Sequence, residues 1–411
     1  MIIPCNKIPN KKKSSLRKQA SDFAFALYDS VAMVNAEHWN GIVKSGSEFL
    51  ELDYLRVLEN NNPPNMRFHY SIIYKETIPV AIAYFQVIDF NAEGWGSQVD
   101  KEDETEKCLH AVLKQYLKRG VNRLNIRLLL CGNAFISGEH GFTCTSGIDK
   151  KEAFDALADI IYRIARAEKL RGKIAAVLVK DFYQSSVENA VELKEFKYHD
   201  FEVEPNMIIH ISEDWKTFDD YLDAISKKYR TRAKSIIKKG ATLVTKDFSP
   251  ADISANADQI MKLYNNVHLK AHFRLATLSA NYFSEMKKEM KERFVFTAYY
   301  LDDKMVGFRS SFILHKEVEA HFIGLDYSIN KEYELYQNIL YDYLREAISH
   351  HVQELQLGRT ASEIKSNVGA KAHELTCYIR HRNPISNRII KPFIDYLKPS
   401  EWIPRNPFKE A

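Results

Sequence analysis

The segment from Val318 to Lys365 constrains the fold more than any other part of the chain. A β-rich run, Val318 to Leu325, ends at Asp326, and a helical pattern follows with its apolar residues on one side. A second short β-rich run, Val352 to Leu357, breaks at Gly358. Two strands joined by a single helix run parallel, and open α/β sheets bind ligands beyond the carboxyl ends of such strands. We therefore expect a ligand site where these two strands end.

Polar residues of this unit gather near the strand ends. They are Asp326, Tyr336, Gln337, Arg359 and Lys365. Arginine holds a phosphate or carboxylate through a planar, bidentate group and lysine does so as a point charge, so both cations are binding candidates. Tyr336 could protonate a leaving group, and Asp326 could act as a base. The structural alternatives are a turn residue for Asp326, helix packing for Tyr336 and a solvated loop for the two cations.

Two more candidates belong to the first strand of the unit. Glu319 and His321 are two residues apart and therefore share one face of a strand. A carboxylate that orients an imidazole, or either group acting through water, could remove a proton from an amine. They are the leading candidates for a general base, against the alternative of a polar face on a half-exposed strand.

A basic run, SKKYRTRAKSIIKK from Ser226 to Lys239, precedes this unit and has helical spacing. It carries seven cations and no acid, and Arg230, Lys234 and Lys238 recur every fourth residue to form one ridge. A phosphate-rich ligand such as coenzyme A, a tRNA acceptor end or a lipid headgroup would bind such a helix through Arg230, Arg232 and Lys234. The alternative is a solvated face. Double-stranded DNA is not an expected partner, because helix-turn-helix, zinc and zipper signals are missing.

The organisation of the chain points to two similar domains. At 411 residues the chain is long for one hydrophobic core. Each half shows helices, an antiparallel hairpin, another strand, a helix and a final strand. We expect two copies of one α/β fold (α+β by strand pairing), each with a mixed, largely antiparallel sheet flanked by helices. The expected domains are residues 1–205 and 206–411, with the link near Pro205, which interrupts two β-like runs.

Local patterns predict the individual elements. In the first half, helices are expected over Phe23 to Met33, Glu48 to Leu58 and Cys108 to Lys118, and a loop over Asn91 to Glu106. A further helix is expected where Phe154, Leu157, Ile160, Ile161 and Ile164 recur at helical spacing. Strands are expected over His69 to Tyr74, Pro79 to Ile88, Asn125 to Cys131 and Ile174 to Val179. In the second half, a helix is expected over Trp215 to Ile225 that continues through the basic run to Lys239. Further helices are expected over Ala257 to His268 and Tyr282 to Glu292, and a hairpin over Phe294 to Leu301 and Met305 to Leu314.

Composition excludes several classes of protein. The five cysteines are scattered and form no CxxC pair, which argues against a disulfide framework and a cysteine zinc site, so no metal is expected. A reducing cytoplasm fits this usage. No apolar run has the length of a membrane span, and the basic N-terminus lacks the apolar segment of a secretory signal. Such a tail either stays solvated or makes peripheral contact with a membrane surface. Cys131 and His140 lack a known nucleophile–base spacing, so Cys131 is expected to be a buried thiol.

Aromatic residues are abundant, with 22 Tyr and 23 Phe. Tyr and Phe suit β-strands, so a large sheet core is the first interpretation. A binding groove for a long apolar ligand is the alternative.

The order of elements and three motifs resemble the GNAT acyltransferase superfamily, and in particular its double-domain, Fem-like branch, the peptidoglycan cross-bridge transferases. The motifs are the basic helix, the strand EAHFIGLDYS from Glu319 to Ser328, and Leu357-Gly358-Arg359 followed by KSNVG. The last resembles the Lys-x-x-aromatic-Gly ending of Fem-type domains, with Val368 in the aromatic place. The resemblance implies two tandem GNAT-like domains, with donor binding and catalysis in the second and an acceptor-shaping, degenerate first domain.

One departure from the GNAT pattern concerns the donor. The loop that holds the pyrophosphate of acetyl-CoA is glycine-rich in typical GNAT domains, whereas the matching segment here, Ser328 to Asn338, has no glycine. The resemblance therefore leaves acyl-CoA, acyl-carrier protein and aminoacyl-tRNA open as co-substrates, with no tightly bound cofactor. A missing coiled-coil arm in the second domain favours a donor other than tRNA.

These observations predict a bacterial N-acyltransferase. It would move an acyl or aminoacyl group from an activated carrier to an amine on a small molecule or lipid precursor, in lipid or cell-envelope metabolism. The alternative is a non-catalytic protein that binds or scaffolds a lipid or peptidoglycan precursor.

Overall fold

The protein is described here by a computed structural model, which covers residues 2–3, 23–43, 47–91, 125–270, 276–388, 390, 394 and 401–409. The chain forms two compact units. Unit 1 comprises Met1–Leu52, Pro63–Val203 and Thr376–Lys398, and unit 2 comprises Asp53–Asn62, Glu204–Leu375 and Pro399–Ala411. The main division lies two residues from the expected link at Pro205. The expected basic tail, the helix over 108–118 and nearly all of the loop over 91–106 lie outside the described residues.

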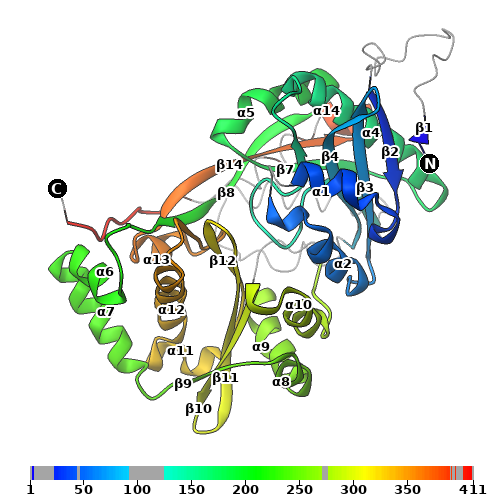
Figure 1. Cartoon of the computed structure of the whole chain (residues 1–411). Helices are drawn as coiled ribbons and strands as arrows, with labels where there is room; N and C mark the ends of the chain where they lie inside the picture. Colours follow the sequence, from blue (N-terminus) through cyan, green and yellow to red (C-terminus); the bar gives the residue numbers. More distant parts are fainter. Residues whose placement is uncertain are drawn as a thin grey trace, which may run out of the picture. The chain divides into compact units, whose positions relative to one another are not determined.

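The two units have the expected fold class. Each contains a mixed, largely antiparallel sheet with helices beside it (Figure 1). The units are not two uninterrupted halves of the chain, however. Residues 376–398 belong to unit 1, because strand β14 (Lys371–His381) continues into the sheet of that unit. Residues 53–62, which comprise most of helix α2 (Leu52–Asn60) and the two residues after it, belong to unit 2.

The sheet of unit 1 has the strand order β1-β2-β3-β4-β5-β7-β14. The strands are β1 (Ile2–Ile3), β2 (Phe23–Tyr28), β3 (Met66–Lys75), β4 (Ile78–Asn91), β5 (Asn125–Cys131) and β7 (Ala176–Tyr183), with the short β6 (Phe142–Cys144) against β4. Strands β2 to β5 pair antiparallel with their neighbours, and β5 and β7 pair parallel. The predicted hairpin and the predicted strand from Asn125 to Cys131 are confirmed.

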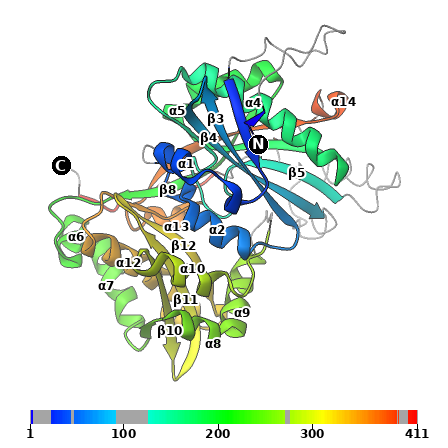
Figure 2. The same ribbon diagram turned by 45° about the vertical axis from the view of Figure 1, so that its right-hand side comes forward.

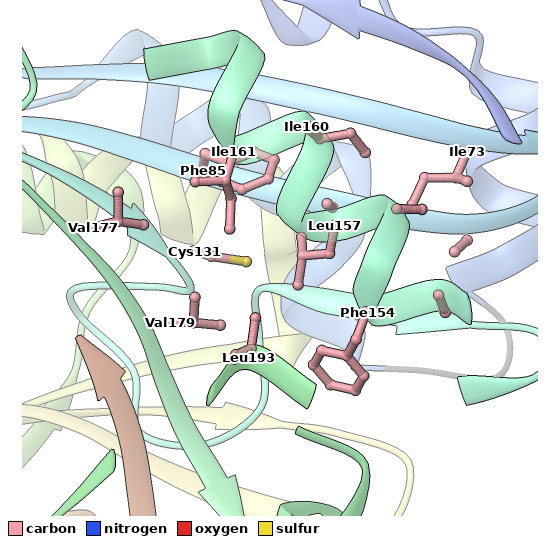
Figure 3. Packing of buried hydrophobic residues seen from close by; sticks show 14 of the residues in the cluster. Ile73, Phe85, Cys131, Phe154, Leu157, Ile160, Ile161, Val177, Val179 and Leu193 are labelled. Carbon is pink, nitrogen blue, oxygen red and sulfur yellow. The ribbon is translucent and has the colours of Figure 1, made fainter. Parts of the chain in front are cut away.

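Helix α4 (Lys150–Ala167) closes the core of unit 1. Asp149 caps its start by accepting a hydrogen bond from the backbone N–H of Glu152, 3.0 Å away. Its apolar side chains recur at helical spacing and pack on Phe85 and Cys131 of the sheet (Figure 3). The predicted helix with Leu157, Ile160 and Ile161 on its inner side is therefore confirmed. The short helices α5 (Gln184–Ala190) and η5 (Val191–Phe196) follow β7.

The helix expected over Phe23 to Met33 is wrong. Residues Phe23–Tyr28 form β2, which pairs with β3 along its whole length, and only Val31–Met33 form a 3-10 turn, η1. The segment FAFALY is apolar throughout, so its spacing does not distinguish a helix from a buried strand. Helix α1 (Ala36–Val43) comes next, and the helix expected from Glu48 begins at Leu52, after the 3-10 turn η2 (Glu48–Leu50).

The sheet of unit 2 has the strand order β8-β13-β12-β11-β10-β9. The strands are β8 (His199–His210), β9 (Val244–Asp247), β10 (Phe294–Leu301), β11 (Lys304–Ile313), β12 (Glu317–Leu325) and β13 (Glu354–Gln356). All neighbours pair antiparallel except β12 and β13, which are parallel as predicted. The expected break at Pro205 is wrong, because β8 passes through this residue without interruption.

Helices cover both faces of this sheet. Helices α6 (Phe218–Ala224), α7 (Lys227–Lys239) and α12 (Leu335–Ser349) pack together on one face, and α9 (Ala257–His268) and α10 (Tyr282–Met290) lie on the other (Figures 1 and 2). Shorter helices are α8 (Pro250–Ala255), α11 (Tyr327–Tyr333) and α13 (Ser362–Ser366). Unit 1 also contains α14 (Pro384–Arg388). The predicted helices α9, α10 and α12 are confirmed. The helix expected to continue from Trp215 to Lys239 is interrupted, because the backbone is extended at Ile225 and Ser226 between α6 and α7.

Aromatic side chains fill the face of the sheet under α9 and α10. Phe283 of α10 packs against Phe296 and Phe308 at ring distances of 5.5 Å, and all three are fully or almost fully buried. The aromatic residues here form a sheet core, which was the first interpretation of their abundance. Within the described residues, no helix has both the length and the apolar character to cross a membrane.

Candidate active site

Strands β12 and β13 separate after only three paired positions. Their pairing runs from Glu317–Glu354 to Glu319–Gln356, but β12 continues to Leu325. The chain after β13 turns to β8 instead: the N–H of Leu357 donates to the carbonyl of Met207, 2.8 Å away. We call this point of separation, after Glu319 and Gln356, the fork. It is the strand arrangement that the sequence predicted for the ligand site.

Lys365 lies at the fork. It is only 5% exposed, and its ammonium group donates to the carbonyl oxygens of Gly358 (3.1 Å) and Arg359 (2.5 Å). Burial lowers the pKa of Lys365 from 10.5 to about 7, although the carboxylates of Glu204 and Glu319 oppose the shift. A lysine with this pKa exchanges a proton readily near neutral pH.

Glu319 is the last residue of β12 that pairs with β13. It is 4% exposed and interacts electrostatically with Lys365 and with the buried Tyr343 of α12. The structure therefore brings together two of the residues singled out from the sequence, a carboxylate and a lysine from segments 46 positions apart in the chain. A buried carboxylate beside a buried lysine can exchange protons without bulk water.

The loop between β13 and α13 is strained. Thr360 and Ala361 have φ angles of 66° and 50°, in the left-handed region that residues with a Cβ rarely adopt. Gly358 has a φ of 70° and no such cost. This backbone holds the carbonyl groups of Gly358 and Arg359 toward the Lys365 ammonium group, so the strain accompanies the lysine's placement.

A polar ladder extends from the fork across the sheet. The side-chain amide of Gln356 donates to Glu317 (3.0 Å) and Glu354 (2.9 Å) and accepts from Asn206 (2.7 Å). His210, which belongs to the neighbouring strand β8, lies 3.1 Å from Glu354 of β13. These side chains alternate with Met207, Leu355 and other residues that pack under α12, so they occupy the face of the sheet away from that helix.

His321 has a different environment from Glu319, although both lie on the face of Phe312. Phe312 pairs with Glu319 across the strands, and its ring lies 4.9 Å from the His321 ring. Nε2 of His321 lies 2.9 Å from the hydroxyl of Tyr282, which is fully buried. Burial lowers the pKa of His321 to about 3, so its ring is neutral.

A β-bulge in β12 lies between Glu319 and the end of the strand. Arg309 pairs with Ile323 and Ser311 with Ala320, so His321 and Phe322 together oppose Ser310. The Ser310 hydroxyl accepts from the N–H of Phe322 (3.1 Å) and donates to its carbonyl oxygen (3.2 Å). Sequence spacing contains no sign of this bulge, which bends β12 beside the fork.

Asp326 caps helix α11. It accepts hydrogen bonds from the N–H (3.1 Å) and the hydroxyl (2.6 Å) of Ser328 and pairs with Lys304 at 3.0 Å. The Ser328 hydroxyl and Lys304 together hold the pKa of Asp326 below its usual value. A carboxylate stabilised in this way is a weak base, so the capping role explains its position better than proton transfer.

The remaining candidates on α12 and α7 make local contacts. Burial raises the pKa of Tyr336, and Gln337 contacts Glu334 and Arg232. Arg230 donates to the carbonyl oxygens of Asp223 and Ile225, which ties α7 to α6. Arg232 and Lys234 are exposed.

Sequence reasoning missed a buried charge network beneath the fork. Arg309 pairs with Glu346 of α12 at 2.8 Å, and the Ser311 hydroxyl donates to the same carboxylate at 2.6 Å. The hydroxyl of Tyr343 donates to the carbonyl of Ser310 at 2.9 Å. These pairs link β11 to α12 across 33 to 37 sequence positions, and no local pattern points to them.

In unit 1, the parallel strands β5 and β7 also stop pairing before the longer strand ends. Their pairing ends at Cys131, the last residue of β5, and Val179, while β7 continues to Tyr183. Beyond Cys131, the ammonium group of Lys180 donates to the carbonyl oxygens of Asn133 (2.7 Å) and Ile136 (2.8 Å). The chain's own loop therefore occupies the position that corresponds to the fork. Glycine is required at Gly132 in this loop, because its φ is 139°.

Cys131 and His140 do not form a catalytic pair. Cys131 is 1% exposed among apolar side chains (Figure 3), and burial raises the pKa of its thiol. Nδ1 of His140 lies 2.6 Å from the Ser47 hydroxyl, and burial lowers the pKa of His140 to about 3. Among the described residues, no group of three or more His, Cys, Asp or Glu side chains could hold a metal ion.

The segment that contains the fork matches a known family. Residues 227–366 match the model of the acetyltransferase (GNAT) domain. The resemblance seen in the sequence is thus confirmed for the part of unit 2 that carries Glu319 and Lys365. The match supports an acyltransferase, and the GNAT fold generally uses acyl-CoA as its co-substrate.

Solved structures show the same fold over most of the chain. The chain is similar to FemX, with a TM-score of 0.52 at 11% identity over 87% of this chain and 98% of that chain. It is also similar to a tandem GNAT protein from the clavulanic acid biosynthesis pathway, with a TM-score of 0.50 at 8% identity over 88% and 99% of the two chains. Identities this low show the fold alone. By sequence, no curated protein matches the chain. The chain therefore has the same fold as these two structures, and its residues 227–366 match the acetyltransferase (GNAT) domain.

Proposed function

We propose that the protein is an N-acyltransferase that moves an acyl or aminoacyl group from an activated carrier to an amine at the fork of unit 2. One observation supports this above the others. Glu319 and Lys365 are both buried where β12 and β13 separate, inside the segment that matches the GNAT domain. A buried ionisable group with a shifted pKa, here Lys365, is typical of a catalytic site.

The open edge of β12 would hold the carrier. Beyond Glu319, residues Ala320 to Leu325 extend past the last pairing with β13. An extended arm that contains amide groups can add to such an edge as an extra strand, because the unpaired backbone groups supply donors and acceptors at regular intervals. The reacting carbonyl group of the donor would then lie beside Glu319.

Glu319 would take the proton of the acceptor amine. The amine nitrogen forms a bond to the carbonyl carbon, the bond from that carbon to the carrier breaks, and the departing thiolate or alkoxide needs a proton. Lys365, with a pKa of about 7, is suited to supply that proton or to stabilise the departing anion. No metal is needed in this sequence of steps.

The acceptor is proposed from fold likeness alone. The sequence motifs resemble the Fem-type cross-bridge branch, and this chain aligns with 98% of the length of FemX. A peptidoglycan or lipid precursor with a free amine is therefore the acceptor class we propose, which places the enzyme in cell-envelope metabolism.

A non-catalytic binding protein is the second candidate. Its support is Asp326, which occupies the helix start where a GNAT domain would receive the donor's pyrophosphate. A binding protein would hold the precursor without turnover, so activity measurements distinguish the two.

The test measures acyl transfer by the full-length protein, with mass spectrometry as the readout. Donors are acyl-CoAs of several chain lengths and aminoacyl-tRNA, and acceptors are a panel of amines that includes muropeptides and aminolipids. We expect Glu319→Gln and Lys365→Met to lower kcat by about 100-fold or more. The matched controls Glu374→Gln and Lys371→Met change exposed residues of β14 and should retain activity. Full activity in both fork variants would refute the proposal.

A further inference from the structure

The helix starts next to the fork are poorly suited to a phosphate group. At the start of α11, the Asp326 carboxylate already accepts a hydrogen bond from the backbone N–H of Ser328. At the start of α12, the capping residue is Glu334, and Asn330 accepts the N–H of Tyr336 at 2.8 Å. Two acidic residues therefore lie where the helix dipole would otherwise favour an anion. A donor with phosphates needs another contact for them.

Helix α7 presents a stripe of lysines to solvent. Its apolar residues Ala233 and Ile236 are buried, and Lys227, Lys234 and Lys238 are exposed on the opposite side. Their spacing of seven and four residues places the three lysines in line, over about 16 Å at 1.5 Å per residue. Thr231, also exposed, falls between them. We call these three lysines the α7 stripe.

The α7 stripe is not neutralised by neighbouring acids. Asp223 pairs with Arg230 and Glu334 pairs with Lys239, both outside the stripe. Within the part of unit 2 that is described, Lys227, Lys234 and Lys238 have no ion-pair partner. A row of unpaired cations of this kind attracts a ligand that carries several negative charges.

The position of α7 is fixed beside the helix that follows β12. The side-chain amide of Asn338 donates to the carbonyl of Ile236 at 3.1 Å, and Gly240 packs directly against it. Arg232 donates to Gln337 of α12 at 3.3 Å. Figures 1 and 2 both show α7 running alongside α12. Helix α12 begins near Gly307, which pairs with Leu325 at the far end of the open edge of β12.

We propose that the α7 stripe binds the phosphate groups of a nucleotide carrier of the coenzyme A type. This inference rests on the function proposed above and adds the site that holds the carrier's charged end. A pyrophosphate and a ribose phosphate together match three lysines spread over about 16 Å, since each ammonium group pairs with one phosphate as a point charge. A nucleic acid would bury a larger basic surface than one helix face.

The experiment compares two double variants of the full-length protein by calorimetric titration with coenzyme A. Lys234→Gln with Lys238→Gln removes two charges from the stripe, and Lys262→Gln with Lys288→Gln removes two exposed lysines from α9 and α10. We expect the stripe variant to raise the Kd for coenzyme A at least tenfold and the control to leave it unchanged. Added salt should weaken wild-type binding more than binding by the stripe variant. Thermal melts confirm that both variants fold.

Three outcomes would overturn the inference. The first is an unchanged Kd for coenzyme A in the stripe variant, and the second is an equal loss of affinity for coenzyme A in the control variant. The third is stripe-dependent binding of a tRNA pool without binding of coenzyme A. The outcome for the phosphate site can be distinguished from the outcome for the proposed acyl transfer. Stripe-dependent binding of coenzyme A without any acyl transfer would refute the enzyme and leave the phosphate site in place. Acyl transfer from acyl-CoA at the same rate in the wild type and the stripe variant would support the enzyme and refute the phosphate site.

Discussion

At the level of a single residue, the burial of Lys365 has a consequence for stability that can be measured. Its pKa is about 7 in the folded protein and 10.5 in an exposed lysine. Between these two pH values the unfolded chain holds a proton that the folded chain lacks, so folding stability rises with pH across this window. We predict that the wild-type protein gains a few kcal/mol of unfolding free energy from pH 7 to pH 10 relative to Lys365→Met.

Chemical denaturation of both proteins over this pH range measures the difference. The Lys371→Met variant, with an exposed lysine replaced, should follow the wild type. Parallel pH profiles for the wild type and Lys365→Met would show that this lysine titrates normally, and the proton-transfer role assigned to it would lose its basis.

Glu168 has the opposite type of shift in unit 1. It is 2% exposed, lies 3.2 Å from His69 and pairs with Arg67 at 2.9 Å. The hydrogen bond with His69 and then the Arg67 guanidinium lower the pKa of Glu168 to about 2, against the effect of burial. The unfolded carboxylate takes up a proton near pH 4.5, so this contribution to stability is lost as pH falls from about 4.5 to 2.

We predict that Glu168→Gln lowers the unfolding free energy by about 2–4 kcal/mol at pH 7, because it leaves the Arg67 charge without its buried partner. Glu152→Gln removes an exposed partner of Lys75 and should cost less than about 1 kcal/mol. Thermal melts of the two variants test the contrast. Equal and small losses would mean that the Glu168 cluster contributes little.

At the level of elements, the buried side chain of Asn338 helps to join α7 to α12. Asn338 donates to the carbonyl oxygens of Ile236, Tyr333 and Glu334 at 3.0 to 3.2 Å. We predict that Asn338→Ala lowers the unfolding free energy by about 1–3 kcal/mol, since buried carbonyl groups lose their donor. It should also weaken coenzyme A binding if α7 must be held in place. Asn367→Ala removes an exposed contact to Glu363 and serves as the control. An unchanged melting temperature in Asn338→Ala would contradict this account.

The elements that could be predicted from the sequence are those with an unambiguous period. The two strands and the long helix of the unit from Val318 to Lys365 were predicted correctly, because alternation, an amphipathic pattern and Gly358 mark them. The turn expected after Asp326 is wrong, because Tyr327–Tyr333 form helix α11. The segment Phe23–Tyr28 was mistaken for a helix because it is apolar throughout. Strand β14 was missed, since KAHELTCYIRH mixes charged and apolar residues and its strand character comes from its neighbours in the sheet.

The candidate site was predictable only in part, for a similar physical reason. Glu319 and Lys365 were singled out from local context, and the structure brings them together. The roles assigned to them remain proposals. The bulge at Ser310, the Gln356 ladder and the Arg309–Glu346 pair depend on contacts between strands and helices far apart in sequence, which local spacing does not encode.

For the whole molecule, the two units are similar in fold and differ at one position. In both units the longer of the two parallel strands continues past the pairing, but in unit 2 a buried carboxylate and lysine lie at the point of separation, whereas in unit 1 a loop held by Lys180 lies there. We therefore assign the chemistry to unit 2. The degenerate character of unit 1 follows as a proposal from the same comparison.

Hydrogen exchange of the full-length protein with and without saturating coenzyme A tests this assignment most directly. The account predicts slower exchange of the amides from Ala320 to Leu325 and from Gly358 to Lys365, with the amides of β5 and β7 unchanged. Protection confined to unit 1, or saturation with coenzyme A that leaves Ala320 to Leu325 exchanging at their original rates, would contradict it.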